Sequence, residues 1–84
     1  MIESSVKVSS ILEPTSAAQL VQRASQFKSR ISIVSNEKTA NAKSIMGIIS
    51  LNLVSGNIVK VIVDGEDEHQ VMPELELLLQ NEAV

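Results

Sequence analysis

The sequence predicts an α+β domain, an open-faced sandwich in which a four-stranded antiparallel sheet is covered on one face by three helices, in the order β-α-β-β-α-β-α. Three observations support this prediction. The N-terminal residues alternate between apolar and polar side chains, as in a strand with one buried face. Residues 17–27 and 71–79 repeat apolar side chains at helical spacing. Residues 58–63 are almost continuously apolar, which is typical of a central strand.

The first quarter of the chain is expected to form one strand and one helix. In residues 2–9, Ile2, Val6 and Val8 fall on the same face of the predicted strand. Pro14 suits the first turn of a helix, where its missing N–H costs nothing. The apolar face of this helix is expected to comprise Ala17, Leu20, Val21, Ala24 and Phe27.

The middle of the chain predicts a hairpin and a short helix. Residues 31–34 and 39–42 are expected to be strands, joined by a turn at residues 35–38. The short helix is expected to begin at Ser44 and to end near Leu53. The central strand follows it, so that the single domain spans residues 1–84.

The last helix has an acidic start and an internal proline. Negative charge at residues 66–68 favours a helix start. Pro73 interrupts the apolar pattern, and its missing N–H is harmless only in the first turn. The helix therefore either begins near His69 or starts earlier and kinks. Its inward face is expected to comprise Val71, Met72, Leu75, Leu78 and Leu79, with Glu74, Glu76 and Glu82 on a solvated face.

The composition excludes several classes of function. Hydrophobic residues make up 44% of the chain, but Phe27 is the only aromatic one, so a base-stacking platform cannot be built. The net charge of −3 disfavours direct binding to nucleic acid. No cysteine is present to form a disulfide or a thiolate metal site, and we expect no metal or cofactor. No segment resembles a signal peptide or a membrane span, which favours a cytoplasmic protein.

Ser44 and the apolar run that follows it are the most informative part of the chain. Ser44 is expected to cap the short helix, and it could also be a phosphorylation site. If Ile45, Ile48 and Leu51 face inward, Met46 and Ile49 point elsewhere. These two side chains are therefore either core residues or part of a docking patch, with Lys43 as a charge on its rim.

Several segments resemble HPr, the histidine-containing phosphocarrier of the bacterial phosphotransferase system. They are Lys43-Ser-Ile-Met-Gly47 with the Ser50-Leu51 that follows, Gly56, the Gly65–Glu68 turn and Leu20-Val-Gln-Arg-Ala-Ser25. The resemblance covers essentially the whole chain and implies the same order of elements. It also implies a phosphoryl-accepting histidine at the entrance to the first helix.

This chain departs from the family at that entrance. Aligned from residues 22–25, Glu13 replaces the histidine and Thr15 replaces the arginine that would steady the phosphoryl oxygens. A phosphocarrier needs a neutral imidazole as nucleophile. A carboxylate would need a metal or a strong cation to offset the repulsion between two anions, and no Lys or Arg flanks Glu13. We therefore expect no phosphoryl relay through this loop.

The pattern is similar to the catabolite-repression HPr of bacilli, a regulatory branch that has lost the histidine and kept the serine. The resemblance implies that an ATP-dependent HPr kinase/phosphorylase modifies Ser44, and that a LacI-type catabolite control protein binds the product. The branch has glutamine where this chain has Glu13, and the family's glycine after the short helix is Asn52 here.

The leading hypothesis from the sequence is a non-catalytic HPr-like regulatory protein. Its expected partner-binding residues are Thr15, Ser16, Lys43, Ile45, Met46 and Ile49. A true phosphocarrier that uses Glu13 or His69 is the first alternative, although the sequence assigns His69 no chemistry. The second is a scaffold or oligomerisation module, since the edge strand at residues 2–8 could exchange between chains and turn a monomer into a homodimer.

Overall fold

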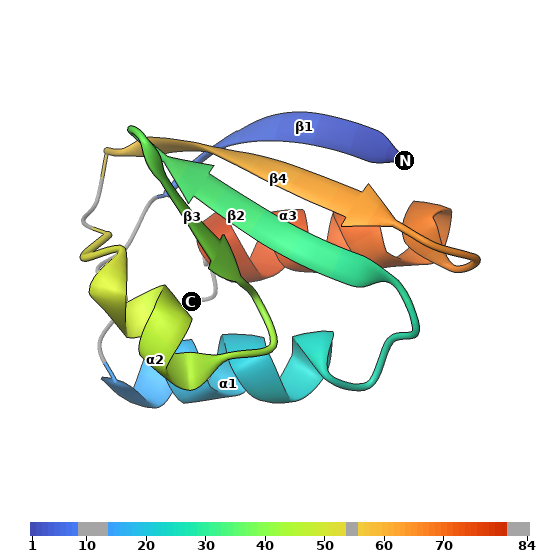
Figure 1. Cartoon of the computed structure of the whole chain (residues 1–84), viewed down its shortest axis with the longest axis horizontal. Helices are drawn as coiled ribbons and strands as arrows, with labels where there is room; N and C mark the ends of the chain where they lie inside the picture. Colours follow the sequence, from blue (N-terminus) through green and yellow to red (C-terminus); the bar gives the residue numbers. More distant parts are fainter. Residues whose placement is uncertain (9–13, 54–55, 81–84) are drawn as a thin grey trace.

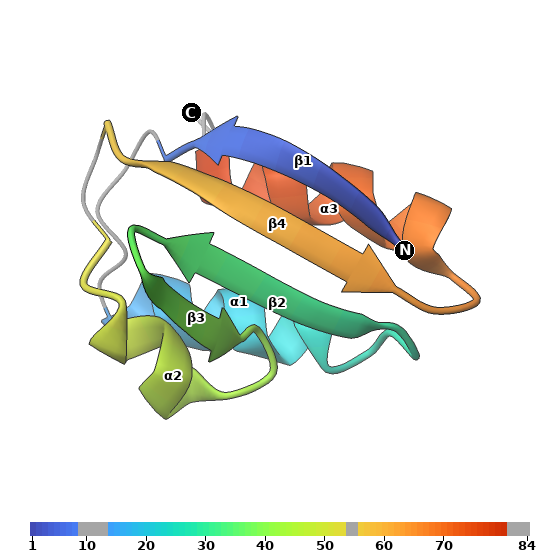
Figure 2. The ribbon, with the colours of Figure 1, turned by 45° about the horizontal axis from the view of Figure 1, so that its top comes forward.

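The computed structural model describes residues 1–8, 14–53 and 56–80, and of residues 14–16 it describes the backbone. Four strands form one antiparallel sheet in the order β1-β4-β2-β3, and three helices cover one of its faces (Figures 1 and 2). This arrangement confirms the predicted fold class and order of elements. The elements are β1 (Ile2–Lys7), α1 (Pro14–Ala24), β2 (Arg30–Ser35), β3 (Lys38–Asn41), α2 (Ile45–Ser50), β4 (Ile58–Asp64) and α3 (Glu68–Gln80).

The core lies between the sheet and the helices, and it is aliphatic. β4 is central, as predicted, because β1 pairs with one of its edges and β2 with the other. Alternate residues of each strand face the helices, so that Val6 of β1 is opposite the buried Val59 of β4. The predicted inward face of α3 is also confirmed, because Val71, Met72, Leu75 and Leu79 are buried and Leu78 packs against the core.

The end of α2 differs from the sequence expectation, and the start of α3 decides between the two positions that the sequence left open. α2 ends at Ser50, three residues before the predicted end, because Asn52 adopts φ +54, a left-handed conformation that Asn tolerates and that stops a helix. α3 begins at Glu68 and continues through Pro73. Its first i→i−4 bond runs from the Val71 N–H to the Asp67 carbonyl, so that Pro73 lies beyond the first turn.

The acidic face of α3 is less solvated than the sequence suggests. Glu74 is half-buried and forms an ion pair with Arg23 of α1 at 3.0 Å. Glu76 accepts a hydrogen bond of 3.0 Å from the Ser4 hydroxyl of β1. Each carboxylate therefore ties α3 to a neighbouring element, which a periodicity argument along one helix cannot detect. Glu82 lies outside the described residues.

The turn before α3 is fastened to the loop between α1 and β2. Asp67 accepts hydrogen bonds from the backbone N–H groups of Lys28 at 2.9 Å and Ser29 at 3.0 Å, and from the Ser29 hydroxyl. These donors favour the charged carboxylate, the Ser29 hydroxyl most, and they lower the pKa of Asp67. Gly65 allows the close approach, because an added Cβ would lie 2.6 Å from the Ser29 Cα.

Candidate functional site

Ser44 caps α2, as the sequence predicts. Its backbone is extended, with φ −116° and ψ 115°, and its Oγ accepts a hydrogen bond of 3.2 Å from the Gly47 N–H. The turn that leads into the cap is held by two further bonds, from the Ser44 N–H to the Asn41 carbonyl at 3.0 Å and from the Lys43 N–H to Asn41 Oδ1 at 2.8 Å. Ser44 is partly exposed, and these bonds hold it at the surface.

The apolar run after Ser44 divides between core and surface. Ile48 and Leu51 are buried, as predicted, whereas Met46 is 74% exposed and Ile49 43% exposed. Ile45, which the sequence placed inward only as a condition and also named as a partner-binding residue, is 38% exposed and belongs with these surface side chains. Within α2, Ile48 is the buried residue, and Ile45 is the first residue of the helix.

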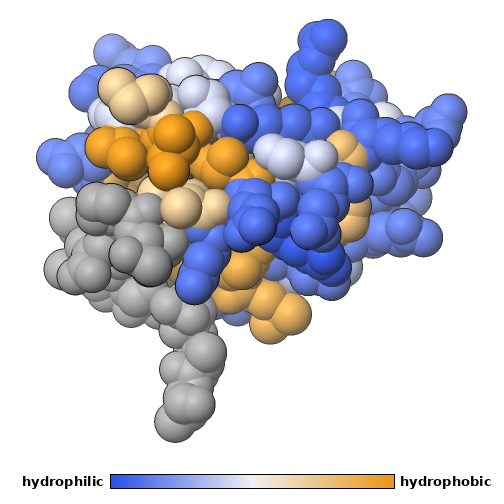
Figure 3. Space-filling view, turned by 90° about the horizontal axis from the view of Figure 1, so that it is seen from below, coloured by the Kyte–Doolittle hydropathy of each residue, from blue (hydrophilic) through white to orange (hydrophobic). Residues whose placement is uncertain are grey.

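The three exposed side chains form what we call the α2 patch: Ile45, Met46 and Ile49. Six large apolar side chains are exposed among the described residues, and half of them belong to this helix. Figure 3 shows apolar surface gathered at this end of the helical face. Because such surface is costly to leave in water, its concentration on one short helix beside Ser44 favours a docking function.

Lys43 has a role that the sequence did not indicate. Its Nζ donates a hydrogen bond of 2.8 Å to the Phe27 carbonyl, just beyond the end of α1. The ammonium group therefore ties the β3–α2 loop to the α1–β2 loop. This contact joins residues 16 positions apart in the chain, and no local pattern of residues predicts it.

The entrance to α1 lies on the same side of the molecule as the α2 patch. α1 packs against α2, and Figures 1 and 2 both show α2 beside the N-terminal half of α1. The backbone of Thr15 and Ser16 is part of the first turn of α1, whereas Glu13 lies outside the described residues. The fold thus places the N-terminal half of α1 and the helix that follows Ser44 side by side.

The only histidine of the chain is elsewhere. His69 belongs to the first turn of α3, which lies at the opposite end of the molecule from the start of α1 (Figures 1 and 2). Its side chain is 84% exposed, and its Nε2 is 3.9 Å from the Glu68 carboxylate. His69 therefore cannot replace a nucleophile at the α1 entrance within this fold.

The described residues show no arrangement that suggests a metal centre or a membrane protein. No group of three or more His, Asp or Glu side chains in this part of the chain could hold a metal ion. None of the helices in it has the length and apolar character needed to cross a bilayer. The described residues form an open-faced sandwich with a serine-capped helix at its surface.

Comparison with known proteins identifies the family. A family model described as the PTS HPr component phosphorylation site matches residues 3–81. The chain is 40% identical over 70 residues to phosphocarrier protein HPr of Xylella fastidiosa, covering 83% of this chain and 79% of that protein. It is also 40% identical over 77 residues to the HPr-like protein Crh of Halalkalibacterium halodurans, covering 92% of each.

The structural comparison agrees. The fold matches the catabolite repression protein Crh of Bacillus subtilis, solved as a domain-swapped dimer, with a TM-score of 0.81 and 36% identity over 100% of this chain and 99% of that one. The chain therefore belongs to the HPr family of the phosphotransferase system. Its relatives include both phosphocarriers and Crh proteins at similar identity.

Proposed function

We propose that the protein is a non-catalytic, HPr-like regulator that passes signals to other proteins and does not relay phosphoryl groups. The observation that carries this proposal is the position of the one histidine, in α3 at the opposite end of the molecule from the α1 entrance. If the chain is aligned to the family without a gap from residues 22–25, Glu13 takes the phosphohistidine position. A carboxylate there repels an incoming phosphoryl group, because both are anions.

Phosphorylation of Ser44 is the proposed control. Ser44 is partly exposed, and the α2 patch lies next to it. A phosphate on Ser44 would add about two negative charges at the start of α2, where the backbone N–H groups favour an anion. The fold would therefore change little on phosphorylation. A partner would instead recognise the phosphate with cations and the α2 patch with apolar side chains.

The proposed partners follow from the family resemblance. An HPr kinase/phosphorylase would modify Ser44 with ATP in the cytoplasm, and a LacI-type catabolite control protein would bind the phosphorylated form. The binding surface would comprise the first turn of α1, with Thr15 and Ser16, and the α2 patch. Lys43 would border this surface from the loop that precedes Ser44.

The kinase reaction tests the regulatory half of the proposal. Incubation with HPr kinase/phosphorylase and ATP is expected to add a single phosphoryl group, measured by intact-protein mass spectrometry. Ser44→Ala is expected to accept none, while losing only about 1 kcal/mol of stability with the cap. Ser50→Ala is the matched control, because Ser50 is exposed on the same helix and its hydroxyl donates only to the Gly47 carbonyl. No addition to the parent chain, or undiminished addition to Ser44→Ala, would contradict the proposal.

A strand-exchanged homodimer is the proposed alternative to a monomer. β1 is an edge strand that pairs only with β4 within the described sheet, and the Bacillus subtilis relative is a domain-swapped dimer. An exchanged β1 would make the same pairing with a second copy, so that the exchange would change few contacts. Light scattering on a size-exclusion column distinguishes the two states.

A further inference from the structure

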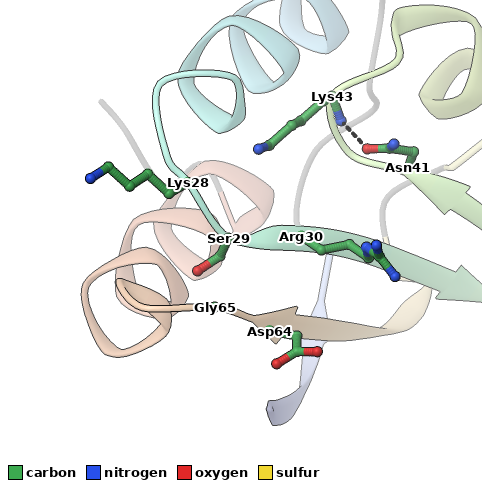
Figure 4. Close-up of a pocket in the computed structure, with 7 residues that line it drawn as sticks. All are labelled: Lys28, Ser29, Arg30, Asn41, Lys43, Asp64 and Gly65. Atoms are coloured by element: carbon green, nitrogen blue, oxygen red, sulfur yellow. Dashed lines mark hydrogen bonds between the residues drawn. The ribbon is translucent and has the colours of Figure 1, made fainter.

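A shallow depression shares Lys43 with the border of the proposed binding surface, but the proposed function uses none of its other lining residues. Its volume is about 600 Å³, within the range of small-molecule sites. It lies where the α1–β2 loop, the β3–α2 loop and the end of β4 meet. Figure 4 shows Lys43 reaching toward the α1–β2 loop, Arg30 lying below Asn41 along β2, and Lys28 pointing outward.

Positive charge is concentrated in this depression. Its lining includes Lys28, Arg30 and Lys43, three of the seven basic residues of a chain whose net charge is −3. Among the residues that the structure describes, neither Lys28 nor Arg30 has an ion-pair partner. The one acidic lining residue, Asp64, lies 3.6 Å from the N-terminal ammonium group.

The neutral groups of the lining also favour an anion. Asn41 Oδ1 accepts from the Lys43 N–H at 2.8 Å, which leaves the Asn41 amide nitrogen as a donor. The Lys43 ammonium group is held by the Phe27 carbonyl at 2.8 Å and keeps two further hydrogens. The α1–β2 loop, which carries Ser29, is held in place by the hydrogen bonds that Ser29 donates to Asp67. The side chains of Asn41 and Lys43 therefore keep donors that an anion could use, whereas the Ser29 hydroxyl already donates to Asp67.

We propose that this depression binds the phosphate group of a small anionic molecule. A phosphate offers three acceptor oxygens and up to two charges, which suit the forked guanidinium of Arg30 or the ammonium of Lys43, whose side chains extend in different directions within the lining (Figure 4). A long polyanion does not fit this role, because the net negative charge of the chain repels it. The depression is open, so the binding is weak and depends on salt. It contains neither Ser44 nor the α2 patch, so it does not depend on the proposed regulatory function.

Titration of the amide NMR spectrum with inorganic phosphate tests the inference, with chloride exchanged for phosphate at constant ionic strength. The signals of residues 28–30, 41–43 and 64–65 are expected to shift and saturate, with a dissociation constant on the order of millimolar. Arg30→Gln is expected to weaken binding about fivefold, because it removes a charge-assisted contact. Asp64→Asn is expected to tighten it, because it removes the opposing carboxylate.

The matched control is Lys38→Gln, which removes the same charge from an exposed residue of β3 outside the depression. It is expected to leave the phosphate affinity unchanged. Shifts that grow linearly without saturation would overturn the inference. So would equal weakening by Lys38→Gln and Arg30→Gln, which would indicate general screening of charge.

Discussion

Replacing Met46 with aspartate is expected to weaken the binding of the Ser44-phosphorylated protein to a LacI-type catabolite control protein by roughly 30-fold or more. The reason is that losing a central apolar anchor of an interface costs at least about 2 kcal/mol. Met46 is the most exposed side chain of the α2 patch, at 74%. In the complex, an aspartate at this position would have to lose its water without gaining a partner. Surface plasmon resonance with the immobilised partner measures the change.

The control for this substitution is Leu77→Asp. Leu77 is a leucine of α3 that is 69% exposed, so the change in side-chain chemistry is similar but lies outside the α2 patch. It is expected to leave the affinity for the partner within about a factor of two of the parent protein's. Both variants should keep the parent melting temperature, because neither side chain is buried. Equal loss of affinity in the two variants, or no loss in Met46→Asp, would show that α2 is not the docking surface.

Gly65→Ala is expected to lower the free energy of unfolding by about 3 kcal/mol, the upper part of the range for overpacked sites. An added Cβ would lie 2.6 Å from the Ser29 Cα and 2.5 Å from the Ser29 Oγ, and backbone cannot move aside as a flexible side chain can. The substitution would push the turn before α3 away from the α1–β2 loop. It would thereby strain the hydrogen bonds that Asp67 accepts from that loop.

Gly47→Ala is the matched control in the urea denaturation that measures this loss. An added Cβ at Gly47 would meet the Ala40 Cβ and the Ser44 Oγ at 3.4 Å, which is close to ordinary contact. Gly47 also lies inside α2, where alanine is favoured over glycine by up to about 1 kcal/mol. We expect this variant to be at least as stable as the parent. A loss in Gly65→Ala no larger than that in Gly47→Ala would refute the role given to the Gly65 approach.

The sequence was sufficient to predict most of the fold. The alternation in β1, the apolar run of β4 and the helical spacing in α1 and α3 each depend on which face is buried, and burial is what residue type reports most directly. The cap at Ser44 was also predictable, because it involves residues only three positions apart. These features agree with the structure because each is local or periodic.

Contacts between distant segments were not predictable in the same way. Lys43 bonds to the Phe27 carbonyl, and Asp67 bonds to the α1–β2 loop, although the sequence indicated only a rim charge and a favourable helix start. The sequence left open whether Ile45 faces the core or a partner, because periodicity alone does not orient a helix of only six residues. The basic depression was not predicted either, because its lining comes from the α1–β2 loop, the β3–α2 loop and the end of β4, which only the fold brings to one place.

An attempt at phosphoryl transfer tests most directly the proposal that this protein does not relay phosphoryl groups. The protein is incubated with phosphoenolpyruvate and enzyme I of the phosphotransferase system, beside a histidine-containing HPr as positive control, and intact-protein mass spectrometry counts the phosphoryl groups. We expect the control to gain one and this protein to gain none, because its only imidazole lies in α3, away from the α1 entrance. An acid-labile phosphoryl group on His69, or an acyl phosphate on Glu13, would contradict the account.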